Sequence, residues 1–289
     1  MTRSCPPNPE PDPGPGGAIS RMSPGLAIAR PKSLEEAAFS SGAALAALDP
    51  ALDPERADIP LALLRDRLAI DAAAACVAFC GRPERAADLR DAVHLLRPGD
   101  LPGPAGAICV QWRRAVAGKV AGRVGDGAGK GQGAPVARAA LALEAMLAGD
   151  PRAEVAALIH ADTVLERAMG WDHPLQLIAA GLARRDLRRT GDDLRLACHV
   201  AIAARAAGTL RLAADLARRA ARLRAVAPAL RAKGAGQAVA MFLARDALAP
   251  AALTPAMSDR AARRLCDRLV GLGAVREITG RDSFRLYGL

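Results

Sequence analysis

The chain has 289 residues, enough for one large domain or two modest ones with a buried core. Half of the residues are hydrophobic (51%) but only 2% are aromatic, so the core has to be alanine and leucine, a mixture that favours close-packed helices over sheets. The net charge of +10 points to an anionic partner, nucleic acid before membrane.

The six cysteines are scattered and form no CxxC pair, and the N-terminus lacks the apolar segment of a secretory signal. Both features predict a reducing, cytoplasmic setting. The longest apolar run, 68–80, is interrupted by Asp71 and is too short to span a bilayer. The sequence therefore predicts a cytoplasmic protein that does not enter a membrane.

Residues 1–32 are rich in proline and glycine and predict a disordered N-terminus. Ser33 with Glu36 forms a capping box that opens a first helix, which is expected to end at Leu48. Two further helices follow, one capped by Asp58 that runs to Cys80, and one over 84–96.

A turn-rich corner over 97–106 leads into a helix that contains Trp112, and the Gly-rich stretch 118–134 predicts a flexible loop or linker. Further helices are expected over 135–147, 151–169, 174–187 and 192–223, the last with a break left open at Gly208, followed by a connector over 225–233. The first region, 33–233, is thus predicted to be one α-helical domain, arranged as a bundle or array.

The last region, 234–289, has the pattern of a winged helix-turn-helix module. A first helix is expected over 236–245, and a cramped second one over 249–256, which contains two prolines. Ser258 is a good cap for the third helix, whose apolar positions recur at helical spacing up to Leu272. The runs 275–278 and 283–287 then predict a β-hairpin that turns at Gly280-Arg281, with Phe284 and Leu286 on one face. The predicted fold class is therefore mostly all-α, with a C-terminal winged helix and a short hairpin.

The third helix carries an unusual number of arginines on its polar side. From Met257 onward, seven arginines stand against four acids, a net charge of +3. Arginine donates two parallel hydrogen bonds to phosphate or to a guanine edge, so this face is typical of a DNA reader. The candidate DNA-binding residues are Ser258, Arg260, Arg263, Arg264 and Arg268 on the helix, and Arg281 at the wing tip.

Other motifs predict no catalytic, cofactor or metal site. Gly129-Lys130 suggests a phosphate loop, but the pattern needs glycine at 124 and serine or threonine at 131, where Val124 and Gly131 stand, and no strand precedes the glycines. Cys76 and Cys80 share a helix face without the further ligands that zinc needs. The Asp172-His173 pair has no nucleophile beside it in sequence.

Four stretches together resemble a bacterial family known only as domain of unknown function 1403: RPGDLPGPAG, MGWDHPLQL, DLARRAARLRAVAPALRAKGAG and the terminal MSDRAARRLCDRLVGLGAVREITGRDSFRLYGL. The resemblance covers about residues 34–289 and implies membership without an activity to carry over. The terminal stretch is also similar to the winged-helix modules of bacterial regulators and of Fic-type proteins, although no HPFxxGN-type motif is present.

The hypothesis that these features favour is a cytoplasmic DNA-binding or regulatory protein that contacts double-stranded DNA through its C-terminal module. A non-enzymatic helical adaptor whose winged helix binds a protein partner is the alternative. An enzyme would need Asp172, His173 and other polar groups to converge in one pocket. The sequence does not indicate an oligomeric state.

Overall fold

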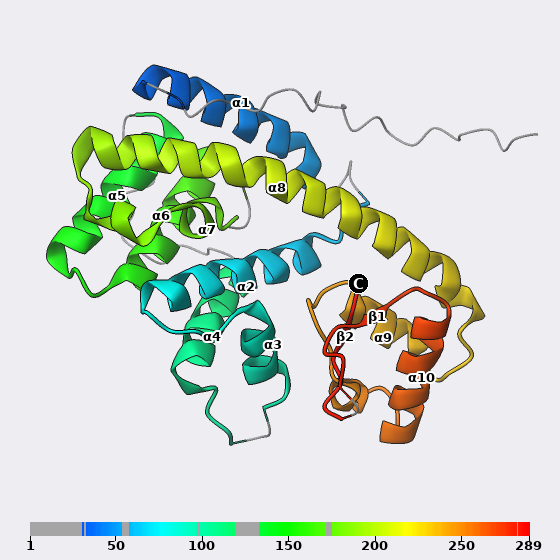
Figure 1. The fold of residues 1–289 in the computed structure, drawn as a ribbon. Helices are drawn as coiled ribbons and strands as arrows, with labels where there is room; N and C mark the ends of the chain where they lie inside the picture. Colours follow the sequence, from blue (N-terminus) through cyan, green and yellow to red (C-terminus); the bar gives the residue numbers. More distant parts are fainter. Residues whose placement is uncertain are drawn as a thin grey trace, which may run out of the picture.

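A single long helix, α8 (Gly191–Val226), runs across the molecule from the helices of the first region to the C-terminal region (Figure 1). The structure is a computed structural model that describes residues 31, 33–53, 58–96, 99–118, 133–171, 175–281 and 283–289. Nearly all of its regular structure is helical, and the one sheet in these ranges has two short strands. The expected all-α class is confirmed. The expectations for residues 1–32 and for most of 118–134 lie outside the described residues.

Helix α1 (Leu34–Leu52) lies along α8 and begins at the predicted cap, Ser33. The Ser33 side chain accepts the Glu36 backbone N–H at 3.2 Å. The helix passes Pro50, where the sequence predicted a break, and ends at Asp53. Ala51 and Leu52 pack against the core, and this apolar contact offsets the hydrogen bond that proline removes from the last turn.

Helix α2 (Leu61–Phe79) forms the centre of the first half and is buried on nearly every side, with Leu64, Leu68 and Ile70 fully or almost fully covered. The predicted cap at Asp58 is wrong: the helix starts after Pro60, and the main-chain oxygen of Asp58 instead accepts a hydrogen bond from Arg224 at 3.1 Å. The helices that pack on α2 include α3 (Ala86–His94) and α4 (Gly103–Ala117).

Helices α5 (Pro135–Gly149) and α6 (Glu154–Met169) form a pair beside α8, close to their predicted ranges. The single helix expected over 174–187 is wrong. The chain forms a short α7 (Leu177–Gly181) and a 3₁₀ turn η1 (Arg184–Arg188). Gly181 lies directly on α8, where a Cβ atom would stand 2.8 Å from Ala201, so α7 stops against α8 and the chain bends away.

The C-terminal region starts with a 3₁₀ turn η2 (Ala227–Ala229) and continues through α9 (Ala235–Phe242), η3 (Pro250–Leu253), α10 (Asp259–Gly271), β1 (Arg276–Glu277) and β2 (Tyr287–Gly288). The strands pair antiparallel, and Leu248 bridges to Tyr287. The helix expected over 249–256 is only the η3 turn, since Pro250 and Pro255 limit regular backbone hydrogen bonding. Phe284 has a φ of 54° and is exposed, so it does not share the buried face of Leu286.

Most buried hydrophobic side chains of both predicted domains form one large cluster, and Ala247, Ala249 and Leu286 form a second, small one. The large cluster contains Leu64 and Leu223 from the first region and Phe242 and Leu269 from the second. The two regions therefore share a core, and a domain boundary at residue 234 stays a prediction.

Helix α8 is both long and apolar. The segment Gly191–Ala229 contains a window with a mean hydropathy of 1.2, so by length and composition alone it could cross a membrane. Of that window, 39% is buried inside the fold, where α8 contacts α1, α5 and α7. A core helix has the same properties, and the cytoplasmic location stays a prediction.

Candidate nucleic-acid interface

Helix α10 separates its apolar and charged residues onto opposite sides. Ala262, Leu265, Cys266 and Leu269 are buried beneath it. The predicted cap is confirmed, because the Ser258 side chain accepts the Ala261 backbone N–H at 3.4 Å, and Ser258 itself is exposed. Burial of the apolar side fixes the helix rotation and turns its arginines outward.

Four of the five candidate arginines lie on this exposed side: Arg260, Arg263, Arg264 and Arg268. Arg263 forms an ion pair with Asp259 at 3.1 Å, and both side chains are more than half exposed. Such a pair contributes little and can exchange for a phosphate. Arg268 continues the row toward Arg231, and both line a shallow hollow of about 660 Å³ beside η2.

Arg281, the predicted wing-tip contact, points elsewhere. Its guanidinium forms an ion pair with Asp91 of α3, and its backbone N–H donates to Glu277 at 3.2 Å. The hairpin is therefore held against the first helical region. Since Asp91 lies 190 residues away in the chain, no local pattern could have shown this partner.

A second basic surface lies between the C-terminal part of α8 and the segment after α10. It is a cavity of about 370 Å³ whose charged lining consists of Asp215, Arg218, Arg219, Arg222 and Arg276. None of these arginines is among the DNA-binding candidates that the sequence predicts. The sequence signal for this surface is the repeated spacing of arginines along α8. That spacing does not show that these arginines share a pocket with Arg276, because the pocket depends on the position of β1.

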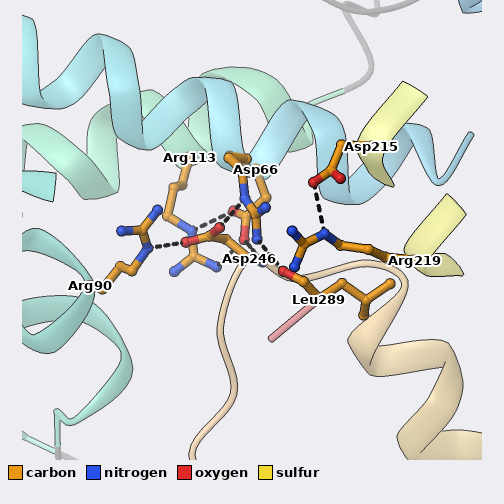
Figure 2. Close-up of polar contacts among 8 residues, drawn as sticks. Asp66, Arg90, Arg113, Asp215, Arg219, Asp246 and Leu289 are labelled. Carbon is orange, nitrogen blue, oxygen red and sulfur yellow. Dashed lines mark hydrogen bonds and ion pairs between the residues drawn. The ribbon is translucent and has the colours of Figure 1, made fainter. Parts of the chain in front are cut away.

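Behind this cavity, a buried ion-pair network joins the two regions of the chain (Figure 2). Asp246, which follows α9, is fully buried and binds Arg67 of α2 at 2.5 Å and also Arg90 of α3. The Asp246 backbone N–H donates to Asp66 at 2.9 Å, and Asp66 binds Arg113 of α4 at 2.7 Å.

Arg67 extends the network to the end of β2, donating to the main-chain oxygen of Leu289 at 3.2 Å. Burial alone would raise the pKa of Asp246, but the attraction and hydrogen bonds of Arg67 and Arg90 lower it below its ordinary value. Asp246 is therefore ionised and fully engaged, which suits a structural role rather than acid-base chemistry.

His94 lies beside the same network at the end of α3. The pKa of His94 is lowered to about 4, first by burial and then by the positive charge of Arg113, against the attraction of Asp66 and Asp246. Its Nε2 atom is buried and has no hydrogen-bond partner among the residues that the structure describes. The ring is therefore neutral at pH 7.

Cys76 and His199 are held in the packed interior. Cys76 is buried and accepts the Trp112 indole N–H at 3.4 Å, whereas Cys80 is exposed. His199 is held by Ser41 at 2.6 Å. Among the residues that the structure describes, no three His, Cys, Asp or Glu side chains gather as metal ligands. Asp172, His173 and the Gly129-Lys130 stretch lie outside the described residues.

Gly288 lies where the last strand passes the backbone of Asp246. A Cβ atom at 288 would stand 2.5 Å from the main-chain oxygen of Asp246, so the strand would have to move. We expect Gly288→Ala to lower the free energy of unfolding by about 2 kcal/mol, measured by urea unfolding. The control is Gly208→Ala in α8, where a Cβ meets nothing within 4 Å and alanine should leave stability equal or higher. Equal losses in both variants would argue against the close approach.

Comparison with known proteins gives one match. A family model described as "Protein of unknown function (DUF1403)" matches residues 17–128 and 123–289. No curated protein matches the chain, and no solved structure matches it. The family description carries no activity or site residue, so function has to be argued from the surface of this chain.

Proposed function

The protein belongs to the DUF1403 family of unknown function, and from its own surface we propose that it binds double-stranded DNA through helix α10 of a C-terminal winged-helix module. The observation that carries the proposal is the exposed row Arg260, Arg263, Arg264 and Arg268 on a helix whose other side is buried. A rigid helix with a row of arginines matches the spacing of phosphates and base edges in the major groove.

The order of elements supports a winged-helix module. Helix α9 is followed by the bridge at Leu248, the η3 turn, α10 and the β1–β2 hairpin. The Leu248–Tyr287 bridge adds a third segment to the edge of the hairpin, through backbone hydrogen bonds of 2.8 and 2.9 Å. The module departs from the full pattern at η3, where a second helix would stand. Contacts with DNA therefore rest on α10 alone.

The wing makes no contribution in this proposal, because Arg281 is occupied by Asp91. The exposed N-terminus of α10, capped by Ser258, adds backbone N–H groups and a positive helix end to the basic face. Arg260, Arg263 and Arg264 lie within its first two turns. The N-terminal half of α10 is thus the part that we expect to enter the groove.

The test is Arg263→Ala with Arg264→Ala in the full chain, with fluorescence anisotropy of a random-sequence DNA duplex across a salt series. We expect affinity to fall roughly tenfold per lost arginine contact, and the slope of log K against log salt to decrease by about two. The unfolding midpoint should stay unchanged, because both side chains are exposed.

The matched control is Arg184→Ala with Arg185→Ala, which removes the same charge from η1, next to the opposite end of α8. If both double variants lose affinity equally, binding follows net charge and α10 is not the reader. If the wild-type chain does not bind the duplex at low salt, the proposal fails.

One observation favours the second candidate, a protein-binding adaptor. Three large apolar side chains of the same module are exposed: Val270, Leu272 and, at 63% exposure, Phe284. Exposed apolar groups beside arginines are common in protein interfaces. An absence of DNA binding, with a partner captured by the wild type and lost in Phe284→Ser, would support this candidate.

A further inference from the structure

The cavity between α8 and β1 has an unusual charge balance. Four arginines (Arg218, Arg219, Arg222 and Arg276) face one side-chain carboxylate, that of Asp215, so the side chains of the lining have a net charge of +3, beside Leu289, which also lines the cavity. Asp215 is shared by two of them, at 3.1 Å from Arg218 and 2.7 Å from Arg219. One carboxylate cannot neutralise two guanidinium groups, so positive charge remains in the cavity.

The other two arginines have no acidic partner among the described residues. Arg222 donates to the main-chain oxygen of Leu272 at 3.2 Å, a neutral acceptor. Arg276 has no ion pair there. Burial lowers the pKa of Arg276, and the charges of Arg219 and Arg67 lower it further. Burial is the largest cause of this shift. The smaller contributions of Arg219 and Arg67 show that like charges lie near Arg276, with the carboxylate of Asp215 opposing them.

Gly273 shapes the cavity wall. It has a φ of 62°, and a Cβ atom there would stand 2.6 Å from the Arg222 guanidinium. The absence of a side chain allows Arg222 to lie flat along the backbone that follows α10. The position of one cavity arginine thus depends directly on a glycine.

We propose that this cavity, formed by Arg219, Arg222 and Arg276 around Gly273, binds a small phosphorylated molecule. Arginine holds phosphate by paired, charge-assisted hydrogen bonds, and three guanidinium groups from two elements can contact one phosphate from different directions. The volume of about 370 Å³ exceeds that of a phosphate group alone and falls in the range of pockets for small organic ligands. The remaining space would hold the rest of the molecule.

A small molecule fits this cavity better than a DNA backbone does. The arginines line a recess between two elements, whereas the α10 row lies on a convex helix surface that a groove can reach. A bound phosphate would join the end of α8 to β1, next to the segment that ends α10. The ligand would therefore fix the placement of the winged-helix module on the helical region.

The test is isothermal titration calorimetry of the full chain with inorganic phosphate and with pyrophosphate, at constant ionic strength and with sodium chloride as the blank. We expect saturable binding of one equivalent, tighter for pyrophosphate. Arg276→Gln should weaken it about tenfold or more, since one charge-assisted contact is lost. Asp215→Asn should strengthen it, because a competing carboxylate is removed.

Arg211→Gln is the matched control, an exposed arginine of α8 that does not line the cavity, and its affinity should equal that of the wild type. Gly273→Ala is a second test of the cavity, because a side chain at this position displaces Arg222 without changing the charge. Circular dichroism melts check that Arg211→Gln and Gly273→Ala fold. No saturable binding of either probe, or equal affinities in Arg276→Gln and Arg211→Gln, would overturn the proposal.

The DNA proposal is separable from this one. Arg263→Ala with Arg264→Ala should leave pyrophosphate binding unchanged, and a chain that binds pyrophosphate but no duplex would retain the cavity site alone. If Arg276→Gln weakens duplex binding while the wild type binds neither phosphate nor pyrophosphate, the cavity belongs to the DNA surface and the small-molecule site is wrong.

Discussion

Asp246→Ala should lower the free energy of unfolding by about 3–5 kcal/mol, because it leaves two guanidinium groups in a largely buried place without their carboxylate. The side chains of Arg67 and Arg90 are only 11% and 23% exposed, and that of Asp246 is fully buried. Water reaches these guanidinium groups only in part and does not fully replace the lost carboxylate. Urea unfolding followed by far-UV circular dichroism measures the change.

The matched control is Asp215→Ala. Asp215 also binds two arginines, but its side chain is 35% exposed and one partner, Arg218, is 72% exposed. Exposed pairs contribute at most about 1 kcal/mol, so this variant should stay close to the wild type. A loss in Asp246→Ala that is no larger than in Asp215→Ala would mean that the buried network does not hold the two regions together.

The second large effect is a pH dependence that arises from His94. The unfolded chain takes up a proton on His94 near pH 6.5, whereas the folded chain does so only near pH 4. Between these values the unfolded state binds more protons, so stability falls as the pH is lowered. This pKa shift corresponds to about 3 kcal/mol of the free energy of unfolding, and all of it is lost at and below pH 4. The charged groups around the ring are Asp66, Arg113, Asp246 and Arg245.

The measurement is the difference in free energy of unfolding between the wild type and His94→Leu, at steps from pH 8 to pH 4. The difference is needed because Asp162 acts in the opposite sense. Burial raises the pKa of Asp162 to about 7, against the hydrogen bonds from Ile178 and Ala179, so its contribution to stability increases as the pH falls. If the free energies of unfolding of the wild type and of His94→Leu change in parallel over this pH range, this result contradicts a buried, neutral histidine at position 94.

Much of the helical fold could be predicted from the sequence, because it depends on neighbours within one or two turns. Ser33 and Ser258 cap their helices as predicted, through contacts three residues away. The apolar positions of α10 are the buried ones, so its arginines had to face outward. The errors lie where a distant contact outweighs local preference: α1 continues past Pro50, and α7 stops where Gly181 meets α8.

Composition, caps and helical spacing thus determined an all-α chain with an arginine row on α10, since these signals are local. The tertiary structure alone decided which charges meet. It pairs Arg281 with Asp91, buries Asp246 between arginines of α2 and α3, and places Arg276 beside the arginines of α8. An ion pair depends on the distance between two side chains in space, and residues that are 156 to 190 positions apart come together only when the core packs.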